Sequence, residues 1–70
     1  MERKKVNSGR LRSAGYDASG RILEIEFNDG SVYQYSNVSS DLYRRFDGAL
    51  SKASFFEDNI EEGLPRRRVK

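Results

Sequence analysis

The sequence is most informative between residues 27 and 35, which read Phe27-Asn28-Asp29-Gly30-Ser31-Val32-Tyr33-Gln34-Tyr35. The Asn-Asp-Gly run is typical of a β-hairpin turn, and the residues after it predict a strand with both tyrosines on one face. Because successive side chains point to opposite faces of a sheet, a one-residue shift in pairing would move both tyrosines to the other face. The turn therefore determines whether their rings belong to the core or form an exposed aromatic surface.

Two hairpin turns are compatible with this stretch. A two-residue loop at residues 29–30 pairs Phe27 with Val32 and places both tyrosines on the same face as the glutamates of the preceding strand. A three-residue loop, with Gly30 in the left-handed conformation of a bulged type I turn, pairs Phe27 with Ser31. The two registers bury different side chains.

The burial of polar groups separates these registers. The shorter loop would bury Gln34 and Ser36, and each unpaired buried polar group costs about 1–3 kcal/mol. The longer loop instead gathers five apolar or aromatic side chains on one face: Leu23, Ile25, Phe27, Tyr33 and Tyr35. We therefore predict the three-residue loop, in which Tyr33 and Tyr35 are mainly structural and pack beneath a helix.

The rest of the chain predicts strands followed by helices. Residues 11–17 and 22–27 are expected to form two strands before the third at 31–36. Ser39 is a good helix N-cap, and Gly48 weakens the helix that it begins, so either Ser51 or Ser54 is expected to begin a separate short helix. The expected apolar stripe comprises Leu42, Phe46, Ala49, Leu50 and Ala53. The predicted fold class is α+β, a three-stranded antiparallel β-meander packed on one face by one or two C-terminal helices.

Length and composition limit the class of protein. The chain has 70 residues, so we expect a single domain at residues 6–63 between flexible basic ends at 1–5 and 64–70. It contains no cysteine and no histidine, so we expect no metal, no cofactor and no enzyme activity. No apolar run approaches the roughly 20 residues that span a bilayer, and the first residues lack the apolar core of a signal peptide. A cytoplasmic protein without membrane contact is expected.

The charges are segregated along the chain. Residues 1–12 carry five basic and one acidic side chain, and residues 64–70 carry four basic side chains. Residues 13–63 carry four basic against ten acidic side chains. The body of the chain is therefore acidic and both ends are basic. Attraction to RNA phosphates is expected to come chiefly from the ends, where it would be independent of base sequence and sensitive to salt.

A set of aromatic and basic side chains could contact RNA. The candidates are Tyr16, Tyr43, Arg44, Arg45, Arg66, Arg67 and Arg68. The alternative is that these charges are exposed and serve only solubility. Glu24 and Glu26 are expected to lie on the open sheet face and to repel phosphate there. The acidic residues between 57 and 62 lack the spacing of a calcium-binding loop, which indicates a solvated helix face.

The order of these short motifs resembles the KTSC domain. The matching segments are Val6-Asn7-Ser8, Gly15-Tyr16-Asp17, Leu23-Glu24-Ile25-Glu26-Phe27, Asp29-Gly30-Ser31-Val32-Tyr33-Gln34-Tyr35 with Val38, and Ala49-Leu50-Ser51-Lys52 with Phe55, Phe56 and Ile60. The family is named for its occurrence at the C-terminus of some lysyl-tRNA synthetases and also occurs as free-standing bacterial proteins. The resemblance implies a non-catalytic module of unassigned function, with RNA, and tRNA in particular, as the suggested ligand.

The chain departs from the family pattern at two places. Ala53 stands where many members resemble Ser-x-Gly, and Glu61-Glu62 replaces a commonly basic stretch. The second change removes positive charge from the body, which weakens the expectation of RNA binding. The alternative hypothesis is a protein-interaction or assembly module, with a protein partner and no nucleic-acid role.

Overall fold

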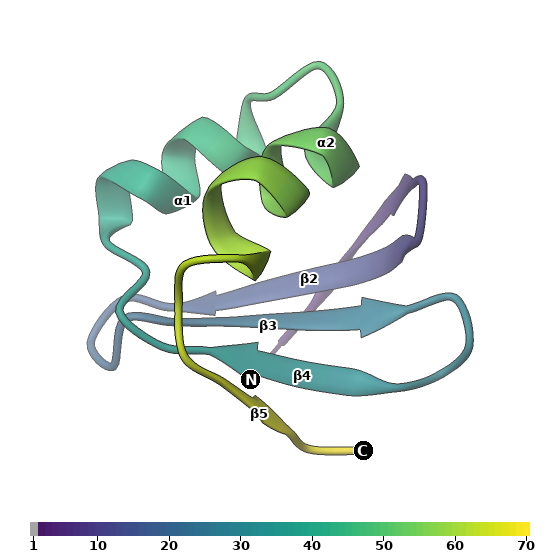
Figure 1. The fold of residues 1–70 in the computed structure, drawn as a ribbon, viewed down its shortest axis with the longest axis horizontal. Coiled ribbons are helices and arrows are strands. Elements are labelled where there is room, and N and C mark those ends of the chain that lie inside the picture. Colours follow the sequence, from purple (N-terminus) through teal and green to yellow (C-terminus); the bar gives the residue numbers. More distant parts are fainter. Residues whose placement is uncertain (1) are drawn as a thin grey trace.

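The computed structural model describes residues 2–70. Its elements are β1 (Lys4–Ser8), β2 (Leu11–Asp17), β3 (Ile22–Phe27), β4 (Val32–Tyr35), α1 (Ser40–Asp47), α2 (Lys52–Phe56), the π-helical turn η1 (Glu57–Glu61) and β5 (Arg66–Arg68). The strands form one antiparallel sheet in the order β1-β2-β3-β4-β5. The helices lie on one side of this sheet (Figure 1). The predicted α+β class is confirmed.

The sheet has five strands rather than three, and both additional strands come from the basic ends. β1 pairs with β2 and β5 pairs with β4, so residues 4–8 and 66–68 are strands rather than flexible ends. The Val69 amide donates to the Val32 carbonyl at 2.7 Å, and the Ser36 amide donates to the Pro65 carbonyl at 2.9 Å. The prediction of loose ends was wrong because backbone hydrogen bonds to a neighbouring strand can order a segment that has few apolar groups. Both new strands are edge strands, where charged side chains discourage aggregation.

The β3–β4 hairpin has the three-residue loop. Gly30 has φ of +90°, in the region that favours glycine. The Gly30 amide donates to the Phe27 carbonyl, and the Phe27 amide donates to the Ser31 carbonyl, both at 2.9 Å. Leu23 pairs with Tyr35, and Ile25 with Tyr33, which confirms the predicted register.

The helix caps also follow the sequence. The Ser39 hydroxyl accepts a hydrogen bond from the Leu42 amide at 3.1 Å, and Gly48 caps the end of α1. Ser51 caps the start of α2, so the helical region is divided at the predicted place. Leu50 is a correction, because it lies in the connection between the helices with a relative exposure of 109% rather than in an apolar stripe.

The core lies between the sheet and the helices. Its largest fully buried side chains are Tyr35, Phe46, Phe56, Leu11, Leu23, Ile25, Ile60 and Val38. Tyr35 is buried, as the register predicted, whereas Tyr33 is only partly buried and lies nearer the edge of the core. Within residues 2–70, no helix has the length and apolar character needed to cross a bilayer.

Candidate functional site

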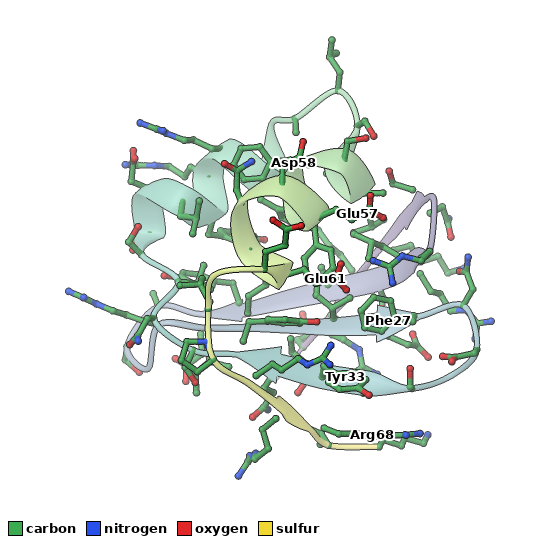
Figure 2. The ribbon with its side chains drawn as sticks, viewed as in Figure 1. Phe27, Tyr33, Glu57, Asp58, Glu61 and Arg68 are labelled. Atoms are coloured by element: carbon green, nitrogen blue, oxygen red, sulfur yellow. The ribbon has the colours of Figure 1, made fainter. Side chains whose placement is uncertain are left out.

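A pocket of about 390 Å³ opens between the β3–β4 hairpin and the end of η1. The rings of Phe27 and Tyr33 line it, together with the charged side chains of Arg10, Glu61 and Arg66. The two rings meet edge to face, with centroids 5.8 Å apart. Figure 2 shows Glu61 in the helical layer, with Phe27 below it and Tyr33 below Phe27 in the sheet. The pocket therefore combines an apolar wall with groups of both charges.

Guanidinium groups lie over both aromatic rings of this pocket. The Cζ atom of Arg66 lies 5.1 Å from the centroid of the Tyr33 ring, and that of Arg68 lies 5.9 Å from the same centroid. Arg10 is similarly placed over Phe27, at 5.4 Å. Because Tyr33 pairs with Arg68 across β4 and β5, the alternating residues of β5 bring both Arg66 and Arg68 to the face that carries the tyrosines.

Arg10 also holds the acidic residues of η1. It forms ion pairs with Glu57 at 3.2 Å and with Glu61 at 2.9 Å. Glu57 and Glu61 therefore neutralise a basic side chain from the β1–β2 turn, whereas the sequence predicted a solvated acidic face. Figure 2 shows Asp58, in contrast, pointing away from the sheet.

Tyr35 contributes an unsatisfied polar group beside this pocket. The residue is fully buried at 0% relative exposure, and its hydroxyl has no hydrogen-bond partner among the residues that the structure describes. Burial raises the pKa of this hydroxyl, Glu61 adds to the shift, and Arg66 and Arg10 oppose it. All three of these charged residues line the pocket, whereas Tyr35 itself is buried behind it and does not line it. An unpaired buried polar group of this kind costs about 1–3 kcal/mol.

The Tyr35→Phe variant is expected to be as stable as the parent protein or more stable. The substitution removes an oxygen that is buried without a partner and keeps the ring that packs edge to face on Phe56 at 5.1 Å. Urea denaturation measures the free energy of unfolding. The matched control is Tyr16→Phe, which loses a 2.6 Å hydrogen bond to the Val38 carbonyl and should cost about 1 kcal/mol. Equal losses in both variants would show that the Tyr35 hydroxyl has a partner after all.

The face of the sheet opposite the helices is less acidic than the sequence suggested. Arg3 forms an ion pair and hydrogen bond with Glu24, and Gln34 donates to the same carboxylate at 2.9 Å. Burial raises the pKa of Glu24, but the hydrogen bonds from Gln34 and Arg3 outweigh it and leave the pKa below its ordinary value. Glu26 accepts a hydrogen bond from the Ser13 hydroxyl at 2.8 Å. It also lies 3.8 Å from Arg12. Basic side chains from the N-terminal segment therefore lie against both carboxylates, which the sequence had predicted to be free on the open sheet face.

The predicted RNA-contacting residues fall into separate groups. Tyr16 and Tyr43 do come together as parallel stacked rings, with centroids 4.4 Å apart and planes 4° apart. They line a second pocket of about 290 Å³, beside Arg3 and Lys4.

The basic residues of that predicted set are placed elsewhere. Arg44 and Arg45 are exposed on α1, and both lie against Asp41 at 3.5 Å and 3.2 Å. Arg66, Arg67 and Arg68 form β5, which is separated from β2 and Tyr16 by β3 and β4. Arg67 points to the opposite face from its neighbours and donates to Gln34 at 3.0 Å. The structure therefore does not unite the predicted residues in one site.

Most residues that line the pocket were missed as site residues: Arg10, Phe27, Asn28, Asp29, Ser31 and Glu61. Phe27 had been assigned to the core, and the sequence contains no signal that it would border a cavity. Arg10 comes from the β1–β2 turn, and its ion pairs span 47 and 51 residues of sequence. No local pattern could have predicted that contact.

Fold and pocket together define the class of this protein: a small α+β domain with an antiparallel five-stranded sheet, helices on one face and an arginine-lined aromatic pocket at one edge. The chain belongs to the KTSC domain family, whose model matches residues 7–63. The resemblance predicted from its motifs is confirmed. The matched segment ends before β5.

Two known proteins are similar to this chain. A KTSC domain protein from Yersinia pestis has a crystal structure that superposes with a TM-score of 0.93 at 36% sequence identity, covering 99% of this chain and 97% of that one. An uncharacterised protein from Stutzerimonas stutzeri (strain A1501) is 43% identical over 42 residues. That match spans 60% of this chain and 59% of the relative. Neither name indicates a catalytic activity or a ligand.

Proposed function

We propose that this KTSC domain is a non-catalytic cytoplasmic module that binds single-stranded RNA, including the unpaired parts of tRNA. The single observation that carries the proposal is the arrangement of β5. Its three consecutive arginines form no ion pair within the part of the chain that the structure describes, and two of them lie over the partly buried ring of Tyr33.

The distribution of ion pairs supports β5 as the contact surface. Most basic side chains of the body and of the N-terminal segment lie against a carboxylate: Arg3, Lys4, Arg10, Arg12, Arg44 and Arg45. A paired cation has less to offer a phosphate, because binding would have to compensate for the lost partner. The arginines of β5 carry no such cost, and Lys70 adds another positive charge beyond them.

Arginine and an aromatic ring are together suited to single strands. Unpaired bases stack on aromatic rings and on guanidinium planes, while other guanidinium groups contact the phosphates. β5 places Arg66 and Arg68 on the side of Tyr33, and Arg67 on the opposite face of the sheet. A strand of RNA along this edge would therefore meet both stacking groups and phosphate-binding groups.

Titration of single-stranded RNA and of tRNA with the purified protein tests this function. We expect binding at low salt, with the logarithm of the binding constant falling linearly with the logarithm of salt concentration. Each neutralised phosphate contributes roughly 0.7 to that slope for a single strand. Absence of binding to both RNAs at low salt would retire the proposal.

A protein-interaction role is the second candidate, favoured by the fully exposed side chain of Leu50 between α1 and α2. One apolar side chain is a small contact, so this role would need additional surface. Concentration-dependent association in analytical ultracentrifugation, with no RNA binding, would favour it over the first candidate.

A further inference from the structure

The pocket beside Tyr33 contains more recognition chemistry than a phosphate contact requires. Its volume of about 390 Å³ lies within the range of about 300–1,000 Å³ that is usual for small-molecule sites. Two aromatic rings line it, Arg66 supplies hydrogen-bond donors, and Glu61 supplies acceptors.

The carboxylate of Glu61 argues against a bare anion as the occupant. Both of its oxygens accept from the same Arg10 nitrogen, at 2.9 Å and 3.0 Å. Each oxygen therefore keeps a further lone pair that can accept from a ligand. An inorganic phosphate would face this negative charge and could donate little to it. The occupant must instead be a flat group that carries acceptors for Arg66 and donors for Glu61.

Guanine has this pattern of donors and acceptors. Its O6 and N7 atoms form a pair of acceptors that arginine binds with two hydrogen bonds, and its exocyclic N2 amine is a donor on another edge. Adenine presents a donor beside N7, which would oppose the donors of Arg66, and cytosine presents a donor where guanine carries O6. The flat ring would contact the walls formed by Phe27 and Tyr33.

We propose that this pocket binds one unpaired guanine base, with Arg66 on its acceptor edge and Glu61 on its donor edge. This inference rests on the proposed function, RNA binding, and adds that the bound RNA is recognised at an unpaired guanine. The same chemistry could also come from a free guanosine nucleotide. The experiment therefore includes both sources.

Isothermal titration of the full chain with GMP, AMP, UMP and CMP measures the preference directly. Parallel titrations use short single-stranded oligonucleotides with one guanine or none. We expect GMP and the guanine-containing RNA to bind at least about tenfold more tightly than their counterparts, which is the effect of one well-placed hydrogen bond.

Two variants and one control separate base recognition from folding. Arg66→Gln and Glu61→Gln should each reduce the preference for guanine by about tenfold. Glu57→Gln is the matched control, because Glu57 also pairs with Arg10 but does not line the pocket. It should lose part of the same ion-pair network and keep the preference. Denaturation of each variant confirms that the compared proteins are folded.

The outcomes distinguish this inference from the proposed function. RNA binding with equal affinity for all bases overturns the guanine pocket and leaves RNA binding intact. Selective binding of GMP without RNA binding supports the pocket, identifies a free nucleotide as its source, and retires the RNA function. A preference for guanine that survives in both Arg66→Gln and Glu61→Gln places the base elsewhere and overturns the inference.

Discussion

Replacing Arg66, Arg67 and Arg68 together by glutamine is expected to weaken RNA binding by on the order of 100-fold at low salt, since contacts between charged groups contribute about 1 kcal/mol or more each. Glutamine keeps the backbone that pairs with β4, so the strand itself should persist. The variant removes three cations that lie near phosphates in the proposed complex. The salt dependence should therefore also become shallower, by roughly two units of slope.

A second charge variant controls for net charge. Arg44→Gln with Arg45→Gln removes two exposed arginines from α1, both of which lie against Asp41. We expect a small change in RNA affinity from this variant, because these cations are already paired and lie away from β5. Equal losses of affinity per charge in the two variants would show that RNA responds only to net charge, and β5 would lose its special role.

Replacing Phe56 by alanine is expected to remove most of the stability of the domain. Phe56 is fully buried, and its ring packs edge to face against Tyr35 at 5.1 Å and against Phe27 at 5.9 Å. Removal of a buried phenylalanine side chain costs about 3–5 kcal/mol. Small domains lie at the low end of the usual range of about 5–15 kcal/mol for unfolding. Urea denaturation followed by circular dichroism should show a variant that is largely unfolded or close to its midpoint without denaturant.

The adjacent residue provides the control for Phe56. Phe55 occupies the next position of α2 but is only partly buried against the core. Phe55→Ala should therefore cost clearly less than Phe56→Ala, although the same number of atoms is removed from the same helix. A similar cost at both positions would show that the loss arises from helix propensity rather than from the cavity beside Tyr35 and Phe27.

The hairpin and the helix caps could be predicted from the sequence because their chemistry is local. Gly30 can take a positive φ without a steric penalty. The alternation of apolar residues in β3 favours the register that puts both tyrosines on the apolar face over the register of the two-residue loop. Ser39 and Ser51 bond to amides three residues ahead of them, so a short window of sequence contains the whole interaction. The burial of Tyr35 followed from the same register.

The two edge strands were not predicted, because each has few apolar residues and is ordered by interactions with other segments. β5 consists of three arginines, which by composition predict a solvated tail. It is held by hydrogen bonds to β4 and by contact with the ring of Tyr33. β1 likewise depends on β2 and on the ion pair between Lys4 and Asp47, at 2.7 Å. The pairing of β5 with β4 and the ion pair of Lys4 with Asp47 join residues far apart in the sequence, whereas β1 and β2 form a local hairpin.

Local sequence patterns predicted one part of the candidate site, and tertiary packing determined the rest. The amino-acid order alone predicted that Phe27 and Tyr33 share a face, because the alternative turn would bury Gln34 and Ser36 in their place. Tertiary packing brought Arg10, Glu61 and Arg66 around those rings and left the Tyr35 hydroxyl buried without a partner. Local backbone preferences act over a few residues, whereas a pocket forms only where separate elements meet, and the positions of those elements follow from the packing of the whole chain.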